Sequence, residues 1–461
     1  MGHIMISAAH KSSGKTTVSI GLCAALAARG HNVRPFKKGP DYIDPLWLGK
    51  ASGNGCYNLD FYTMQPNEIV TTFAERSSPV DISIIEGNKG LYDGMELDGS
   101  NSNAALAKLI NAPVVLVIDC QGITRGIAPL LLGYQQFDNE IVIAGVILNK
   151  VAGPRHETKL RQAVEHYTNL PVLGAIHRNR ELTIEERHLG LVPSNEAGGA
   201  ERKIESIANL VAAQVDLDAI IEIAANAKPL TAGTQQQPSA TMDLRIGVAR
   251  DAAFGFYYEN DLDAMRAAGA EPIFFDTLND KTLPDVDALF IGGGFPETHM
   301  AALETNSEMR SAIHAAIEAD MPVYAECGGL MYLSRSLQWQ GSTAEMVGAI
   351  PADTVMHPRP VGRGYVELEE SGQGPWPLTN SDSQPGQFKG HEFHYSALEN
   401  LPDGLNYAYN VLRGVGIDGT RDGIVYRNLL ANYAHLRDTA SNRWIGRFIE
   451  FVRRCKNSTA T

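Results

Sequence analysis

Cysteine is scarce in this sequence of 461 residues, and its five copies form no pattern. No two of them have the close spacing of a CxxC redox pair or of a zinc site. Five scattered cysteines without such spacing do not indicate a disulfide framework either. We therefore expect reduced thiols and a cytoplasmic protein. The cysteines are Cys23, Cys56, Cys120, Cys327 and Cys455.

Basic residues are outnumbered by acidic ones. The chain has 39 Lys and Arg against 53 Asp and Glu, for a formal net charge of -14. Non-specific binding to nucleic acid or to an anionic membrane requires a basic face. We therefore expect neither nucleic acid nor a membrane among the partners.

Long hydrophobic runs and internal repeats are also missing. No apolar stretch reaches the roughly 20 residues of a membrane-spanning helix. The first apolar run, residues 4–9, ends at His10 and Lys11, which is not the pattern of a signal peptide. The length of the chain exceeds that of one ordinary core and predicts two domains.

Short apolar runs alternate with helical patterns in both halves of the chain. In the first half, strands are expected at residues 4–8, 82–85, 114–118 and 141–148, and helices at 16–29, 103–110 and 157–166. In the second half, strands are expected at 244–248, 271–275, 286–291 and 323–325. This alternation predicts α/β architecture with two doubly wound domains. We place the domains at residues 1–223 and 244–461, joined by a linker at 224–243 that is rich in Ala, Gln, Thr and Pro.

A loop typical of phosphate binding follows the first expected strand. Gly14 lets backbone N–H groups approach the phosphates, Lys15 reaches the terminal oxygens, and Thr16 is placed to bind Mg²⁺. The strict motif has a glycine where this chain has Ala9, but the order strand, loop and helix supports an ATP site. The residues expected to bind ATP are Lys11, Ser12, Ser13, Gly14, Lys15, Thr16, Thr17 and Asn149.

Two acidic residues are candidates to complete a metal site with Thr16. Glu86 ends the strand at residues 82–85, and Asp41 lies in a loop that also carries basic residues. For Asp41 the alternative is an ordinary solvated loop charge. Asn149 ends another strand, where it either reads the nucleotide base or belongs to a simple turn.

Cys327 is the strongest candidate nucleophile. An apolar run leads into it, and Gly328, Gly329 and a helical-looking segment at residues 330–337 follow. A sharp turn from strand to helix exposes a thiol and favours the thiolate. An isolated cysteine is more often a buried structural one, but two other features favour catalysis. Gly293 and Gly294 follow a strand and can offer amides to an oxyanion, and His435 can serve as a base.

An ATP site and a thiol amidase site on one chain suggest a coupled reaction. ATP activates a carboxylate as an acyl phosphate, glutamine supplies ammonia, and an amide forms.

The motifs also resemble those of a known family, the glutamine-dependent cobyrinic acid a,c-diamide synthases, over nearly the whole length. The segments that carry the resemblance lie at residues 38–45, 86–94, 112–115, 187–191, 252–258 and 390–396. The resemblance implies a synthetase domain like dethiobiotin synthetase and a class I glutamine amidotransferase domain. It also implies Cys327 as the nucleophile, His435 as its general base, and a tetrapyrrole carboxylate as the acceptor.

The chain departs from this pattern in two places. Many class I amidotransferases have a glutamate two residues after the catalytic histidine, where this chain has Arg437. We therefore expect a Cys-His dyad. Asn88 and Lys89 stand where the diamide synthases have apolar residues, which bears on the choice of tetrapyrrole. The residues expected to contact the substrate are Lys38, Asn88, Lys89 and Tyr92.

We keep several functions open at this point. The first is amidation of cobyrinic or hydrogenobyrinic acid, with ATP converted to ADP in the presence of Mg²⁺. The second is amidation of sirohydrochlorin or sirohaem by the same mechanism. A tetrapyrrole-binding scaffold without turnover and a P-loop partitioning ATPase are the remaining alternatives. The sequence does not decide whether the protein is a homodimer.

Overall fold

The computed structural model describes residues 2–179, 184, 186–187, 190–230, 241–377 and 386–459. The chain forms two compact units, Met1–Gln235 and Gln236–Thr461. Their boundary falls within the segment expected to be a linker. Helix α8 (Leu217–Ala225) extends into the start of that segment, and residues 231–240 lie outside the described part of the chain.

The first unit is built on a seven-stranded sheet with the order β3-β2-β4-β1-β5-β6-β7. Every pair in this sheet is parallel. The strands are β1 (Gly2–Ala8), β2 (Val33–Lys38), β3 (Tyr57–Leu59), β4 (Ile82–Glu86), β5 (Val114–Asp119), β6 (Ile143–Val151) and β7 (Val172–His177). A separate antiparallel pair consists of β8 (Glu186–Arg187) and β9 (Gly190–Leu191).

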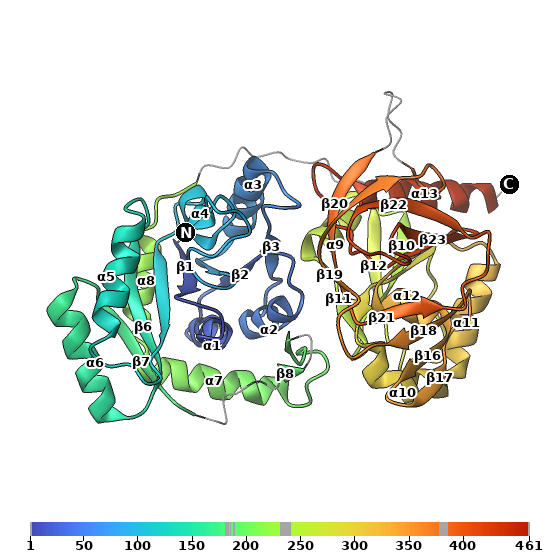
Figure 1. The fold of residues 1–461 in the computed structure, drawn as a ribbon. Coiled ribbons are helices and arrows are strands. Elements are labelled where there is room, and N and C mark those ends of the chain that lie inside the picture. Colours follow the sequence, from blue (N-terminus) through green and yellow to red (C-terminus); the bar gives the residue numbers. More distant parts are fainter. Residues whose placement is uncertain are drawn as a thin grey trace. The chain divides into compact units, whose positions relative to one another are not determined.

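Helices cover both faces of this sheet, because successive strand residues point to opposite sides. Ile4 and Ile6 pack into one core cluster with residues of α1, α7 and α8, whereas Met5 packs into the other with residues of α3 to α6. Figure 1 shows these helices around the sheet. The remaining helices are α1 (Lys15–Ala28), α2 (Ile43–Ser52), α3 (Pro66–Ser77), α4 (Asn103–Leu109), α5 (Ile127–Phe137), α6 (Pro154–Tyr167) and α7 (Ala200–Gln214). The first half is therefore doubly wound, as expected.

The second unit has a nine-stranded mixed sheet with the order β12-β10-β13-β15-β24-β23-β22-β19-β20. The five strands from β12 to β24 are parallel, and the rest are antiparallel. The strands of the unit are β10 (Leu244–Ala249), β11 (Phe254–Phe256), β12 (Ala270–Phe275), β13 (Ala288–Ile291), β14 (Gly293–Gly294), β15 (Val323–Glu326), β16 (Ser334–Trp339), β17 (Ser342–Glu345), β18 (Ile350–Met356), β19 (Gly362–Glu370), β20 (Gln387–His394), β21 (Ser396–Glu399), β22 (Asn406–Arg413), β23 (Arg421–Tyr426) and β24 (Leu429–Asn432).

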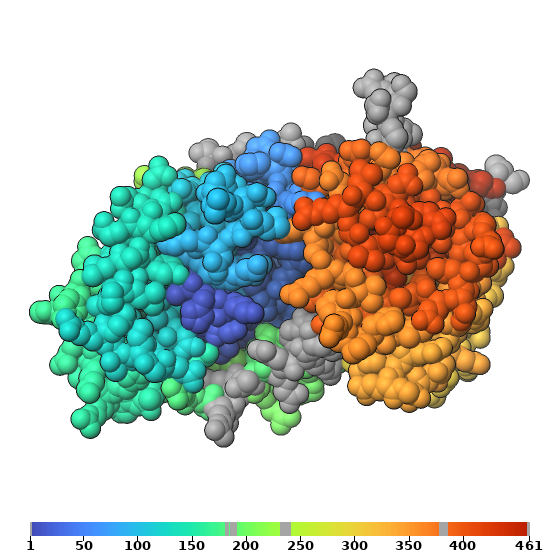
Figure 2. All heavy atoms as spheres, viewed as in Figure 1, coloured from blue at the N-terminus to red at the C-terminus, as the bar shows by residue number. Residues whose placement is uncertain are grey.

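The parallel part of this sheet also lies between two helical layers. Its two core clusters contain residues of α10, α11 and α12 on one face and of α9 and α13 on the other. The helices are α9 (Glu259–Ala267), α10 (Met300–Thr305), α11 (Ser307–Glu318), α12 (Gly328–Leu333) and α13 (Trp444–Thr459), with a 3-10 turn, η2 (Pro296–His299). Figure 2 shows all heavy atoms of the two units, with the first in blue to green and the second in yellow to red.

One expected element is wrong. The segment at residues 330–337 looks helical in sequence, but α12 ends at Leu333 and β16 begins at Ser334. The Ser334 hydroxyl donates to the Met331 carbonyl at 2.7 Å and so binds the last turn of the helix. This serine competes with helix continuation, which the apolar pattern does not reveal. None of the described helices has both the length and the apolar character needed to cross a bilayer.

Trp444 is expected to be a major source of stability in the second unit. It is fully buried, and its ring centroid lies 4.4 Å from that of Tyr324 and 5.6 Å from that of Phe290. Trp444→Ala should lower the free energy of unfolding by about 3–5 kcal/mol, measured by urea denaturation. Phe274→Ala is the control in the same unit, because that ring is 42% exposed and should cost much less. Equal losses in the two variants would contradict this account of the core.

Candidate functional site

The phosphate-binding loop has the backbone geometry that its sequence predicts. It connects β1 to α1, with Gly14 in the left-handed region at φ 87°. A Cβ at Gly14 would lie 2.2 Å from Asn149 Nδ2, so a larger residue does not fit there. Asn149 Nδ2 donates to the Ser13 carbonyl at 2.8 Å and fixes the loop against the end of β6.

An open pocket of about 900 Å³ lies over this loop. Its volume is within the range of small-ligand sites. Lys15, Thr16, Thr17 and Asn149 line it, as the sequence analysis predicts for an ATP site. The pocket is also lined by Lys150, beside Asn149, and by Leu191 of the segment 187–191. Further lining residues were not singled out in the sequence, namely Gln121, Ile176, His177, Arg178, Asn179 and Ile184.

The remaining predicted ATP residues lie along the same loop. Ser12 and Gly14 line the pocket, while Ser13 is buried and Lys11 is exposed. Lys150 braces the loop from outside, since its Nζ donates to the Ser12 carbonyl and to Asp119 Oδ2, each at 2.8 Å. Of the predicted ATP residues, all but Lys11 and Ser13 therefore line one pocket.

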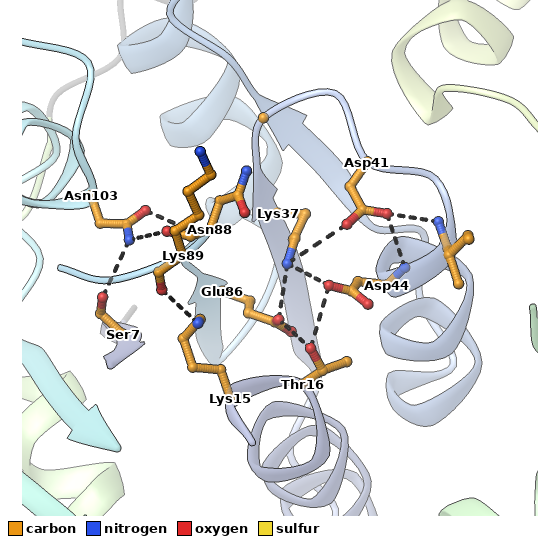
Figure 3. A network of polar contacts seen from close by, with 12 residues as sticks. Ser7, Lys15, Thr16, Lys37, Asp41, Asp44, Glu86, Asn88, Lys89 and Asn103 are labelled. Carbon is orange, nitrogen blue, oxygen red and sulfur yellow. Dashed lines mark hydrogen bonds and ion pairs between the residues drawn. The ribbon is translucent and has the colours of Figure 1, made fainter. Parts of the chain in front are cut away.

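A buried ammonium group lies among the expected metal ligands (Figure 3). Lys37 Nζ donates to Asp44 Oδ2 at 2.5 Å and to Glu86 Oε1 at 2.9 Å. It also lies 3.9 Å from Asp41 Oδ2. The Thr16 hydroxyl donates to Glu86 Oε1 at 2.8 Å and contacts Asp44 Oδ2 at 3.3 Å. Thr16, Asp41 and Glu86 therefore do converge, and Asp44 joins them.

Burial and charge set the protonation of this cluster. Burial opposes the charge on Lys37, but Asp44 and Glu86 outweigh it and hold its pKa well above the usual range. Burial together with the nearby Asp44 raises the pKa of Asp41 to about 7. Burial likewise raises the pKa of Glu86. For Asp44, burial is outweighed by Lys37, and its pKa is lowered.

The oxygen-rich composition of this cluster fits Mg²⁺. Mg²⁺ in nucleotide sites is usually held by one or two carboxylates together with substrate phosphates. Glu86 Oε2 is buried and has no hydrogen-bond partner among the described residues, which leaves one carboxylate oxygen for a cation. Among the same residues, no group of three His, Cys, Asp or Glu side chains forms a metal site by itself. The protein would therefore supply only part of the coordination.

Asn103 holds the loop after β4 in place, as Figure 3 shows. Its Nδ2 donates to the carbonyls of Asn88 at 2.5 Å and Gly90 at 2.7 Å, and its Oδ1 accepts the Asn88 N–H at 2.9 Å. Lys89 in this loop has φ 50°, and its carbonyl accepts Lys15 Nζ at 2.6 Å. The loop is thus connected directly to the lysine of the phosphate-binding loop.

The four residues expected to contact a substrate lie in different settings. Asn88 and Lys89 are exposed, and Figure 3 shows their side chains pointing away from Lys37. Burial lowers the pKa of Lys38 to about 8, an effect that Asp60 opposes and Lys89 reinforces. The Tyr92 hydroxyl donates to the Tyr134 carbonyl at 2.7 Å, and its ring packs on Phe137. None of the four lines the pocket over the loop, and their role stays a prediction.

In the second unit, Cys327 occupies a strained turn between β15 and α12. Its backbone has φ 47° and ψ -102°, a conformation that a non-glycine residue rarely adopts. The two glycines that follow allow close packing, since a Cβ at Gly329 would lie 2.1 Å from the Ile291 carbonyl oxygen. Cys327 is 6% exposed. This is the strand-turn-helix geometry expected of a nucleophile.

His435 lies beside the thiol and is almost fully buried. It is hydrogen-bonded to Cys327, and its Nδ1 lies 3.2 Å from Glu326 Oε2. Burial lowers the pKa of His435, but the hydrogen bonds with Cys327 and Glu326 outweigh it and raise the pKa to about 10. The contact with Glu326 was not foreseen. Its only sequence signal is its position directly before Cys327.

The glycines expected at the oxyanion site lie next to this pair. A Cβ at Gly293 would lie 2.6 Å from His435 Cε1, and a Cβ at Gly328 would lie 2.9 Å from Gly294 N. β14 therefore passes directly beside the base and the turn that carries the nucleophile. This proximity supports the expected role of Gly293 and Gly294, which stays a prediction.

Loss of the Asn103 side chain should loosen the loop after β4. In Asn103→Ala, amide exchange at residues 88–90 should accelerate roughly tenfold or more, measured by hydrogen-exchange mass spectrometry. Ser102→Ala is the control, because Ser102 Oγ accepts the Ala105 N–H and so caps the start of α4. That change should cost about 1 kcal/mol of stability and leave loop exchange unaltered. Unchanged exchange in Asn103→Ala would show that the loop is held by other contacts.

A methyl group at Gly293 should displace His435. Gly293→Ala should therefore reduce glutamine hydrolysis by about a hundredfold or more, measured as glutamate release. Gly446→Ala is the matched control, since nothing lies within 4 Å of a Cβ at that position of α13. If Gly293→Ala keeps full activity, His435 does not act in the reaction from its observed position.

Comparisons with known proteins agree with this architecture. Residues 4–192 match the CobQ/CobB/MinD/ParA nucleotide binding domain, and residues 245–442 match the CobB/CobQ-like glutamine amidotransferase domain. The cobyrinate a,c-diamide synthase of Magnetococcus marinus is 46% identical over 448 residues, which cover 96% of this chain and 95% of that protein. That of Methanosarcina acetivorans is 42% identical, covering 99% of this chain and 96% of that protein.

Among solved structures, a chain of PurLQS from Thermotoga maritima matches over its full length and covers 47% of this chain. The identity is 15% and the TM-score is 0.36, so this likeness carries no weight in the assignment. The relatives and the two domain matches carry the assignment. This chain belongs to the cobyrinate a,c-diamide synthase family, and it is a glutamine amidotransferase ligase with a P-loop nucleotide-binding domain.

Proposed function

We propose that this protein uses ATP and glutamine to convert acetate side-chain carboxylates of cobyrinic or hydrogenobyrinic acid to amides, through acyl phosphate intermediates. The observation that carries the proposal is the pairing, on one chain, of the pocket over the phosphate-binding loop with the Cys327–His435 pair. The names of the relatives, cobyrinate a,c-diamide synthase, support the choice of acceptor.

Glutamine hydrolysis begins at the thiol in the second unit. The raised pKa of His435 favours its imidazolium form. The reactive form of a Cys-His pair is a thiolate beside an imidazolium. The thiolate attacks the glutamine amide carbon, and amides of Gly293 or Gly294 stabilise the oxyanion. His435 then gives its proton to the departing ammonia, and water releases glutamate from the thioester.

Carboxylate activation takes place in the first unit. A substrate carboxylate oxygen attacks the γ-phosphorus of ATP, ADP leaves, and ammonia displaces phosphate from the acyl phosphate. Lys15 lies where it can neutralise phosphate charge, and Asn149 fixes the loop. Thr16, Glu86, Asp44 and Asp41 would hold Mg²⁺, which neutralises phosphate charge when bound. Lys37 supplies a fixed positive charge beside the same carboxylates.

A second acceptor is favoured by one observation. Asn88 and Lys89 are exposed polar side chains on the loop that contacts Lys15, so they are free to read a substrate. Amidation of sirohydrochlorin or sirohaem is therefore the alternative. Asn88→Val combined with Lys89→Met should change the relative rates for the two kinds of acceptor. A non-catalytic scaffold or a P-loop partitioning ATPase gives no role to the Cys327–His435 pair.

Mass spectrometry of the products tests the function directly. The protein would be incubated with ATP, Mg²⁺ and glutamine, with cobyrinic acid and sirohaem offered separately. Each conversion lowers the acceptor mass by about one dalton, and activation as an acyl phosphate predicts one ADP, not AMP, per amide. Product from sirohaem alone would favour the alternative acceptor, and no product from either would contradict amidation of these substrates.

Supplying ammonium salt in place of glutamine distinguishes glutamine hydrolysis from carboxylate activation. Cys327→Ser should abolish glutamine-dependent amidation but keep amidation with added ammonium salt, because the synthetase residues are untouched. Lys15→Ala should lose both, since phosphoryl transfer precedes amide formation. Cys455→Ser is the control for removal of a thiol, because Cys455 is a half-buried residue of α13 whose sulfur accepts from Asn428 Nδ2 at 3.8 Å. Glutamine-dependent product from Cys327→Ser would contradict the assigned nucleophile.

A further inference from the structure

His435, the base of the thiol site, contacts an acid, but this acid does not lie at the usual position two residues after the histidine. Two residues after His435 the chain has Arg437, a buried cation. The carboxylate next to His435 belongs instead to Glu326, which directly precedes Cys327. The acid that contacts the base therefore lies on β15, the strand that leads into the nucleophile.

The carboxylate of Glu326 is held on both sides. Oε1 accepts the Tyr324 hydroxyl at 2.6 Å and the Leu436 N–H at 2.8 Å. Oε2 lies 3.2 Å from His435 Nδ1. The side chain is 3% exposed, so water does not compete for these contacts. A charge held in this way fixes the tautomer and the orientation of the imidazole that it contacts.

The protonation of His435 has to be set by its surroundings, because a second histidine lies beside it. The rings of His391 and His435 are stacked, with centroids 4.8 Å apart and an interplanar angle of 16°. Two adjacent imidazoles compete for one proton, because both cannot be charged at such a distance without repulsion. The surrounding charges therefore decide which ring is protonated.

The charges around the two rings differ in sign. His435 contacts Glu326 and Cys327, and hydrogen bonds with both raise its pKa. Burial lowers the pKa of His391, and His435 and the guanidinium of Arg437 lower it further. Arg437 lies over the ring of Tyr258 at 4.9 Å, and the Tyr258 hydroxyl is 3.3 Å from His391 Nδ1. Arg437 thus stands on the side of His391, opposite in charge to Glu326.

We propose that Glu326 is the positioning residue of a Cys327-His435-Glu326 triad, and that Glu326 and Arg437 together keep the proton on His435 and off His391. The proposal rests on the proposed function, since it concerns the same thiol site. The acid has moved from the segment of the base to the residue before the nucleophile. Arg437 fills the vacated position without taking part in proton transfer.

Glu326→Gln tests this assignment. The glutamine Oε1 can still accept from Tyr324 and Leu436, but its NH₂ group then faces Nδ1 and disfavours the Nδ1–H tautomer. We expect kcat for glutamine hydrolysis by the full-length enzyme to fall about a hundredfold with little change in KM, less than the loss for a serine triad because a thiol ionises more readily.

The pH profile separates positioning from mere structural support. Activity requires thiolate and imidazolium, so it declines on the alkaline side as His435 loses its proton. Removal of the carboxylate lowers the pKa of His435, and the alkaline limb should move to lower pH in Glu326→Gln. Glu326→Asp keeps the charge but shortens the side chain. Its kcat should lie between those of Glu326→Gln and wild type, and its alkaline limb should lie between theirs.

Glu392→Gln is the matched control. Glu392 is also a buried glutamate, and its carboxylate accepts the N–H groups of Val415 at 2.8 Å and Gly416 at 2.9 Å. This variant should lose stability without moving the alkaline limb. Cys327→Ser is assayed in parallel. If it keeps glutaminase activity, the proposed thiol site is wrong.

The overturning result is a Glu326→Gln enzyme within threefold of wild type with an unmoved alkaline limb, while Cys327→Ser is inactive. That combination would leave the thiol site in place and remove Glu326 from it. If Glu326→Gln does not fold, as judged by circular dichroism, Glu326→Ala decides, because it also removes the carboxylate. Wild-type kcat and an unmoved alkaline limb in Glu326→Ala would equally exclude the role.

Discussion

Parallel strand pairing is the constraint on which both sites depend. It brings the carboxyl ends of neighbouring strands to one edge of the sheet, and its register decides which side chains meet there. In the first unit, Lys37 of β2 pairs with Glu86 of β4. In the second, Glu326 of β15 pairs with Asn432 of β24, and His435 follows three residues later. Residues far apart in sequence therefore meet because their strands end together.

Buried charge is the second shared feature, and the two units use it in opposite ways. In the first, one ammonium group is surrounded by carboxylates that exceed it in number. In the second, a carboxylate and a guanidinium lie on different sides of two stacked imidazoles. Isolated buried charges are costly, so each arrangement persists only with its partners in place. Both clusters are therefore poised to respond to a ligand that changes the local charge.

Much of the fold and part of the site are readable from the sequence, because they depend on local patterns. The alternation of apolar runs indicates the strands, and Gly14 to Thr16 and the turn at Cys327 each form a continuous motif. The contacts that depend on register are not readable in this way. Asp44, Asn103 and Glu326 join their sites through residues up to 109 positions away. The sequence analysis assigned no strands to residues 362–426, where β19, β20, β22 and β23 form the antiparallel part of the second sheet.

The adjacency of Glu326 and Cys327 limits how this enzyme can change. Glu326 is the last residue of β15 and Cys327 is the turn residue that follows it, so one peptide unit joins the acid and the nucleophile. A deletion or insertion of a single residue between the paired part of β15 and the turn would shift both against β24 and displace acid and nucleophile at once. In triads whose acid follows the histidine, the acid and the nucleophile lie on different segments, so an insertion or deletion can affect one without the other. Here the strand can be lengthened or shortened only at its other end, and sequence variation in this site should consist of substitutions without gaps.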